Sequence, residues 1–261
     1  MENYDCNQSA ERVLMDASRK KNQNRNRLLF IVITITVGVI FSVFSLIYGK
    51  MEIDIQKNMK ADGMAVSTYI ENGTADMTQQ LIQLPCIESI GKEKFAGKLL
   101  DDSIKYCDCV ITDVTGFEKM IRPAFTNVVG TYPEKENEIM LSTKTLQYLG
   151  IKNPEVGMEI ELDFYWNDVF HTEGTGLQKF TLSGYFTEYQ NQGASSSVAF
   201  LSEQKLIGNK MTWNPCRVLL DVKEKSASGL QIEQRLTEDV ELQEGQRVIS
   251  RDSAVYRAMK G

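Results

Sequence analysis

Four cysteines follow a long apolar run, and their side chains are the ones best suited to covalent or metal chemistry. They are Cys86, Cys107, Cys109 and Cys216. An even number permits two disulfides in any of three pairings, and the sequence selects none of them. Cys107 and Cys109 flank one residue of a predicted strand, so their side chains share a face. Because no second pair stands at metal-ligand spacing, structural or free thiols are favoured over a metal site.

The other reactive residues form no known catalytic pattern. His171 is the only histidine, and neither H-E-x-x-H nor G-x-S-x-G occurs. Residues 91–99 resemble a phosphate-binding loop superficially, but five residues separate the two glycines and Leu99 stands where a magnesium-binding hydroxyl belongs. Adjacent acids such as Asp101 and Asp102 are typical of a solvated surface. The sequence therefore predicts no enzyme, cofactor or metal.

Residues 28–48 are a run of 21 residues without a charge. About 20 apolar residues in a helix cross the hydrocarbon layer of a bilayer, which is roughly 30 Å thick. Hydroxyl residues within the run, such as Thr34 and Thr36, can bond to the helix's own carbonyls. We therefore predict a membrane-spanning helix, with the lipid bilayer as one partner of the chain.

Basic residues lie mainly before the run, and the positive-inside rule uses such an asymmetry to orient a helix. They are Arg12, Arg19, Lys20, Lys21, Arg25 and Arg27. The rule predicts that residues 1–27 are a cytoplasmic leader in a cell-membrane protein and that residues 49–261 lie outside the cytoplasm. A cleaved signal peptide is the alternative, but the apolar run is too long and no small-x-small site follows it.

The charge balance of the outer region limits its partners. Residues 49–261 carry 31 acidic and 23 basic side chains. This excess of negative charge argues against binding to nucleic acid. The region is long enough for one large domain or two subdomains with their own cores.

The periodicity of the outer region predicts an α+β domain. We expect a helix or stalk after the membrane span, a strand over residues 64–70, a turn at Asn72 and Gly73, a helix ended by Pro85, and strands over residues 87–114. Further along, the expected strands cover residues 138–141, 158–166, 177–189, 197–201, 216–222 and 247–249.

Three helices are expected among these later strands. Ser142 caps the first, over residues 143–149, and Gly150 ends it in the left-handed conformation. Ser202 starts the second, and an amphipathic pattern over residues 226–240 predicts the third.

The run YPEKENEIMLSTKTLQYLGIKNPEVGMEIEL, at residues 132–162, contains the most specific pattern in the chain. It resembles the segment G-x-Y-P, E-I-x-L-S, L-G-I and x-G-x-x-I-x-L of the periplasmic core domain in FtsX-like and MacB-like ABC transporter permeases. The order of a basic leader, a first membrane helix and a large outer domain is similar too. The residues that match are cap, turn and core positions, so none of them is predicted to be catalytic.

The resemblance implies a function by analogy. A permease of this kind works with a cytoplasmic ABC ATPase and with a second permease copy or half. Its outer domain takes part in the export or recognition of a lipoprotein, peptide or antibiotic. Members of the family carry three more membrane helices, so this chain is expected to be the N-terminal part of a longer permease or a split relative.

A single-pass sensor or adhesion module that binds an extracellular ligand is the alternative function. The single apolar run favours it. The leader of 27 residues disfavours it, because so short a tail cannot hold a kinase or DNA-binding domain. An anchored hydrolase ranks last, since no nucleophile and base can be named.

Overall fold

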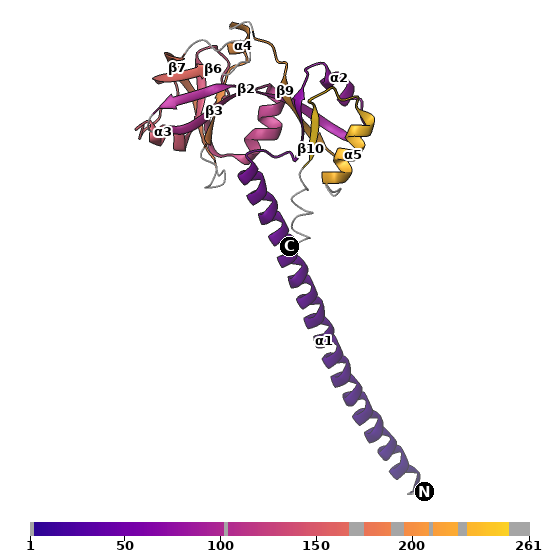
Figure 1. Cartoon of the computed structure of the whole chain (residues 1–261). Coiled ribbons are helices and arrows are strands. Elements are labelled where there is room, and N and C mark those ends of the chain that lie inside the picture. The colour runs from indigo at the N-terminus through magenta and orange to yellow at the C-terminus, as the bar shows by residue number, and fades with distance from the viewer. Residues whose placement is uncertain are drawn as a thin grey trace. The chain divides into compact units, whose positions relative to one another are not determined.

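The computed structural model describes residues 3–101, 104–166, 175–188, 196–208, 211–223 and 229–250. The chain divides into two compact units, Met1–Glu52 and Ile53–Gly261. Figure 1 shows the long first helix and the sheet-rich domain. The first unit is helical, and the second holds the strands and the remaining helices.

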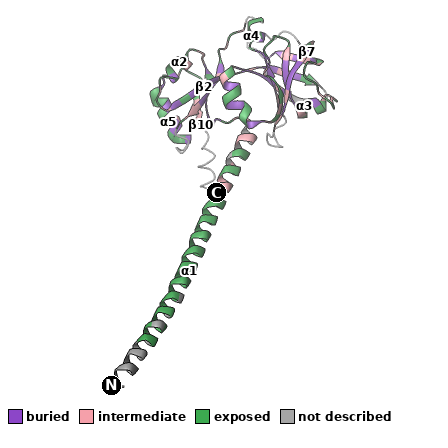
Figure 2. Ribbon diagram, turned by 180° about the vertical axis from the view of Figure 1, so that it is seen from behind, coloured by how far each residue is buried: buried purple, intermediate pink, exposed green. Residues whose placement is uncertain are grey.

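Helix α1 (Asn3–Asp62) contains the apolar run and continues beyond it, as the sequence predicted. Among the residues that the structure describes, the stretch Ala17–Asp54 is the one helical segment long and apolar enough to cross a membrane. The hydroxyls of Thr34, Thr36 and Ser42 each donate to the carbonyl four residues earlier at 2.8 Å. The apolar side chains of the run are exposed (Figure 2), as expected of a surface that faces lipid.

The strands of the described residues form one sheet, in the order β10-β1-β9-β2-β3-β8-β5-β7-β4, with β6 paired to both β2 and β7. Their bounds are β1 Thr68–Gly73, β2 Ile87–Asp101, β3 Ile104–Thr112, β4 Thr126–Gly130, β5 Glu138–Ser142, β6 Glu159–Trp166, β7 Thr175–Thr187, β8 Ser196–Leu201, β9 Cys216–Val222 and β10 Arg247–Ser250. The helices are α2 Met77–Leu81, α3 Thr143–Tyr148, α4 Gln204–Gly208 and α5 Gly229–Asp239. The α+β class predicted from sequence is confirmed.

Pairing of β6 with two strands closes part of this sheet into a barrel. The ring runs β2-β3-β8-β5-β7-β6 and returns to β2 through the pairing of Leu99 with Phe164. Alternate residues of all six strands point into it, because side chains alternate between the two faces of a strand. The barrel core consists of Ala96, Leu99, Cys107, Cys109, Ile111, Ile139, Leu141, Ile160, Leu162, Phe164, Trp166, Phe180, Leu182, Ala199 and Leu201, with Leu146 and Leu206 from α3 and α4.

The rest of the sheet forms a second lobe beside the barrel. It contains β1, β9, β10 and the first half of β2, which pairs with β9 from Ile87 to Glu93. Helices α2 and α5 cover one face and bury Leu81, Ile232 and Leu236 against it. The lobe core also includes Ile70, Met77, Ile87, Cys216, Val218, Leu220 and Val240.

A π-helix, η1 (Gly116–Ile121), covers the opposite face of the sheet and is followed by the 3-10 turn η2 (Arg122–Ala124). Phe117, Met120 and Ile121 pack there against Val110, Phe200, Leu219 and Tyr69. This face cluster draws on strands of both the barrel and the second lobe, so it joins them. The sequence analysis predicted neither η1, η2 nor β4.

One local prediction was wrong. Asn72 and Gly73 were expected to form a turn after a strand over residues 64–70, but both lie inside β1. Asn72 has a φ of 52°, and the pairing of β1 with β9 shifts its register between Ile70 and Gly73. A left-handed residue can make a β-bulge as well as a turn, and here strands distant in sequence hold β1 on both sides.

A substitution at Gly97 tests whether β2 and β6 lie as close together as barrel closure requires. A Cβ atom on Gly97 would lie 2.1 Å from the carbonyl oxygen of Tyr165 on β6. We expect Gly97→Ala to lower the free energy of unfolding by about 1–3 kcal/mol or more, because β2 and β6 must separate. Urea unfolding of the chain in detergent, followed by tryptophan fluorescence, measures this. Gly176→Ala in β7 is the matched control, because nothing lies within 4 Å of its added Cβ; equal losses in both variants would contradict the close approach.

Candidate functional site

Tyr132 anchors the segment that resembles the permease family. Its hydroxyl accepts a hydrogen bond from the Thr112 amide at 2.9 Å and can donate to the carbonyl oxygen of Leu201, also at 2.9 Å. Its ring lies 4.6 Å from that of Phe117 on η1, between centroids. Burial raises the pKa of the Tyr132 hydroxyl to about 12. The side chain therefore fastens the segment to the ends of β3 and β8.

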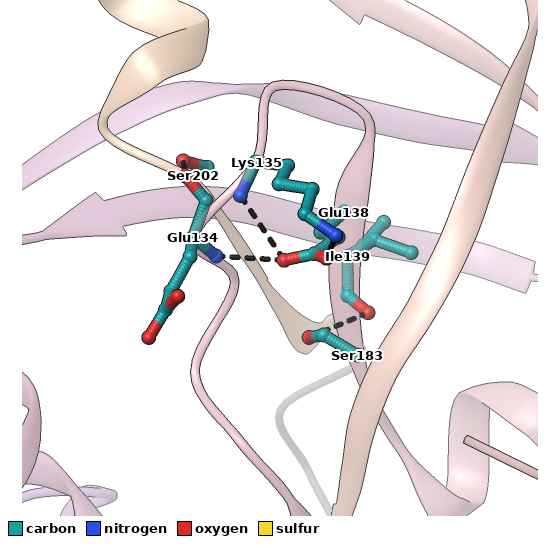
Figure 3. A network of polar contacts seen from close by, with 6 residues as sticks. All are labelled: Glu134, Lys135, Glu138, Ile139, Ser183 and Ser202. Carbon is teal, nitrogen blue, oxygen red and sulfur yellow. Dashed lines mark hydrogen bonds and ion pairs between the residues drawn. The ribbon is translucent and has the colours of Figure 1, made fainter. Parts of the chain in front are cut away.

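The next residues form a tight turn around one carboxylate (Figure 3). Glu138 Oε2 accepts hydrogen bonds from the amides of Glu134, at 2.8 Å, and Lys135, at 3.0 Å. The ammonium of Lys135 lies 3.6 Å from the other oxygen. Ser202 adds a bond from its hydroxyl to the carbonyl of Glu134 at 2.7 Å. Burial alone would raise the pKa of Glu138, but the two amides and the Lys135 charge together hold it below its usual value.

Two glycines let this segment approach the sheet closely. Gly130 has a φ of +82°, and a Cβ on it would lie 2.2 Å from the carbonyl oxygen of Ser183. Gly184, opposite it on β7, is equally confined, because its Cβ would lie 2.6 Å from the carbonyl of Val129. Only glycine fits this geometry without displacing backbone. The first position of the G-x-Y-P pattern therefore has a structural role.

Ser142 caps α3, as the sequence predicted, and also belongs to a buried hydroxyl cluster. Its Oγ accepts from the Thr145 amide at 3.0 Å and lies 2.7 Å from Ser197 Oγ. The Thr145 hydroxyl donates to Ser197 at 2.7 Å, and Ser197 in turn donates to Glu188. Gly150 and Gly157 take the positive φ expected of turns. Cap, turn and core roles thus account for the residues of the family-like segment.

The free thiols of the structure are Cys86, Cys107, Cys109 and Cys216. Cys107 and Cys109 share a face, as predicted, and both lie in the barrel core, whereas Cys216 lies in the core of the second lobe. Cys86 is half-buried just before β2, and its carbonyl accepts a hydrogen bond from the Lys223 amide. Lys223 follows the last residue of β9, whereas Cys216 is the first residue of that strand. A seven-residue strand is about 20 Å long, so Cys86 and Cys216 are too far apart for a disulfide. Disulfide formation by the other pairs stays a prediction.

Within the described ranges no three His, Cys, Asp or Glu side chains are grouped so that they could hold a metal ion. A cavity of about 630 Å³ between α2 and residues 241–246 has Asp76, Glu241 and Glu244 in its lining, but they do not form such a group. His171 lies outside the described residues.

The start of the sheet-rich domain is packed against the end of α1. Met59 of α1, Met64 and Val66 pack against the face cluster that contains Phe117 and Met120. The Ala65 amide donates to the carbonyl oxygen of Met120 at 2.5 Å. The last turn of α1 therefore packs against the face cluster through Met59, and the chain just after the helix is hydrogen-bonded to η1.

A half-buried ion pair lies against the same cluster. Arg217 of β9 donates to Glu93 of β2 at 2.7 Å, and its guanidinium lies 4.9 Å from the Tyr69 ring centroid. Burial raises the pKa of Glu93 more strongly than the Arg217 charge lowers it. Because the Glu93 side chain is only 13% exposed, removing Arg217 would leave its charge without a partner, so the pair constrains how β2 and β9 align. Sequence reasoning missed it, since the two residues are 124 positions apart.

Comparison with known proteins found likenesses at the level of structure. No family model and no curated protein matches the chain. The periplasmic region of MacB from Actinobacillus actinomycetemcomitans is similar at 10% identity and a TM-score of 0.46, over 79% of this chain and 98% of that one. The extracellular domain of the noncanonic ABC-type transporter YknZ from Gram-positive bacteria is similar at 11% identity and a TM-score of 0.40, over 70% of this chain and 100% of that one.

The Glu138 turn predicts a pH-dependent stability. Since the fold lowers the pKa of Glu138 from its usual 4.5, its stabilisation is complete above that pH and is lost as the pH falls through the lowered value. Glu138→Gln should lower the free energy of unfolding at pH 7 by about 1–3 kcal/mol, because two amides lose a charged acceptor. Urea unfolding from pH 7 to pH 3 should show the difference shrinking. Glu155→Gln on an exposed turn is the control. A difference in unfolding free energy between the parent and Glu138→Gln that does not depend on pH would contradict the role of ionisation.

The thiols should differ in reactivity. Burial raises the pKa of Cys107 to about 12 and that of Cys216 to about 11, and it raises that of Cys109 well above its usual value, so the reactive thiolates are scarce. Cys6, which precedes the apolar run, is first replaced in a Cys6→Ser variant. In this variant maleimide at pH 7 should label Cys86 in the native chain and all four remaining cysteines after unfolding. Mass spectrometry counts the labels. Fewer than four labels after unfolding without reductant would reveal a disulfide.

Proposed function

We propose that this chain belongs to an ABC transporter permease and that its sheet-rich domain works outside the cytoplasm, coupled mechanically to α1. The observation that carries the proposal is the continuity of one helix. α1 contains the candidate membrane span and ends in a turn whose Met59 packs into the face cluster of the domain. A displacement of the helix end must therefore displace that cluster, since packed side chains cannot yield independently.

The path from α1 into the sheet is short. The Met120 carbonyl of η1 accepts a hydrogen bond from the Ala65 amide. η1 also lies directly against β2, since a Cβ on Gly91 would come within 2.4 Å of Gly116 Cα. The Asp113 carboxylate fixes the start of η1 by accepting from the amides of Lys92, at 3.0 Å, and Gly116, at 2.8 Å. Such contacts transmit displacement and perform no chemistry. The energy would come from a separate cytoplasmic ABC ATPase, with a second permease copy or half as the other partner.

The family-like segment supports the same proposal from sequence. Residues 132–162 resemble the core domain of FtsX-like and MacB-like permeases, in which an outer domain takes part in export or recognition of a lipoprotein, peptide or antibiotic. In this chain the segment supplies the anchor Tyr132, the Glu138 turn and two barrel strands. We assign it the role of a rigid scaffold that carries a recognition surface.

Copurification tests the proposal. The full chain, tagged and extracted from membranes in detergent, should bring down an ATP-binding subunit, and the ATPase rate should change when the chain is present. Met59→Asp with Met64→Asp should leave copurification intact but remove most of the effect on that rate, because charged side chains cannot remain in the face cluster. Leu177→Asp, at an exposed position on β7, is the control.

Either of two results would overturn the proposal. A chain that copurifies with no ATP-binding subunit would favour the single-pass sensor or adhesion module. An ATPase effect that survives the double substitution in a folded protein would show that α1 does not act through the face cluster.

A further inference from the structure

The connection between α4 and β9 spans both parts of the domain. Its described residues, 211–215, are called the strap here. Trp213, at the centre of the strap, packs against the barrel core and also against the core of the second lobe. One indole ring thus contacts two cores that lie on the same side of the shared sheet. Figure 1 shows the strap running from α4 toward β9.

Polar contacts fix the indole from each side. Its N–H donates to Glu203 Oε1 at 2.8 Å, next to α4 on the barrel. The ammonium of Lys92 lies 4.5 Å from the ring centroid and comes from the half of β2 that pairs with β9 in the second lobe. A cation over an indole face is attracted by the ring electrons. Trp213 is therefore held by one charged group from each part.

Asn214 connects the strap to the residues before α2 and to a second lysine of β2. Its side-chain oxygen accepts from the Ala75 amide, just before α2, at 2.7 Å. Its backbone carbonyl accepts from the Lys94 ammonium at 3.4 Å and from the Thr212 hydroxyl at 3.2 Å. The strap is therefore bonded to both the second lobe and the central strand β2.

The two faces of the sheet differ in the free space beside them. On the η1 face, the backbones of Gly91 and Gly116 are so close that a Cβ on Gly91 would lie 2.4 Å from Gly116 Cα. On the strap face, a cavity of about 340 Å³ lies beside Trp213 and is lined also by Leu206, Ile207 and Met211. β2 shifts its register between Phe95 and Gly97, where it passes from lobe to barrel, and a bulge of this kind bends a strand. Movement between the parts would therefore occur at the strap.

We propose that Trp213 is a clasp that sets the orientation of the second lobe relative to the barrel. With the indole in place, the strap and η1 hold the sheet from opposite faces. With the indole displaced into the adjacent cavity, the sheet flexes at the β2 bulge while the two cores remain folded. This inference concerns the domain alone and does not depend on an ATPase partner.

Distance measurement between spin labels tests the clasp. Gln147→Cys on α3 and Gln234→Cys on α5 place one label on an exposed site of each part, in the full chain with Cys6→Ser and Cys86→Ser. Double electron–electron resonance should give one narrow distance distribution in the parent. Trp213→Ala should broaden or shift it, and Trp213→Phe, which keeps a ring but loses the N–H donor, should have a smaller effect in the same direction.

The other tryptophan provides the matched control. Trp166→Ala removes an indole of the same size from the barrel core but leaves every strap residue in place, and it should lower stability without changing the distance distribution. Thermal unfolding verifies that each variant is folded. A distribution that is unchanged in both folded Trp213 variants, or changed equally in Trp166→Ala, would overturn the clasp.

Discussion

Closure of the barrel by β6 is the constraint on which the rest of the domain depends. β6 bonds to β2 on one side and β7 on the other, so Ile160, Leu162, Phe164 and Trp166 enter one enclosed core. Without β6, that core would be an exposed apolar sheet face, which is costly in water. Gly97 makes the closure possible, because no side chain fits between β2 and the Tyr165 carbonyl.

A closed barrel leaves the outer face of its strands in need of cover, and this need explains η1. Val110 and Phe200 point away from the barrel core, and Phe117 and Met120 of the π-helix bury them. The same cluster takes in Met59 and Met64 from the end of α1. This apolar face of the domain is thus the place where Met59 and Met64 pack.

Charged groups in this structure serve alignment more than chemistry. Burial raises the pKa of Glu93 in spite of Arg217, and two amides lower that of Glu138, yet neither carboxylate has a nucleophile or base beside it. Glu93 joins β2 to β9, and Glu138 closes a turn. Tyr132, with its hydroxyl shared between two strand ends, behaves in the same way. The described contacts of Tyr132 and Glu138 therefore give the family-like segment a structural role.

The sequence by itself determined the features that depend on neighbours within a few residues. These are the long apolar helix, the alternation in β3 and β6, the Ser142 cap and the left-handed Gly150 and Gly157. Spacing and backbone preference decide such features locally. Only the tertiary structure decided that β6 closes a barrel, that Asn72 makes a bulge and not a turn, and that Trp213 contacts two cores. Those outcomes depend on contacts between residues far apart in the chain, about which local patterning carries no information.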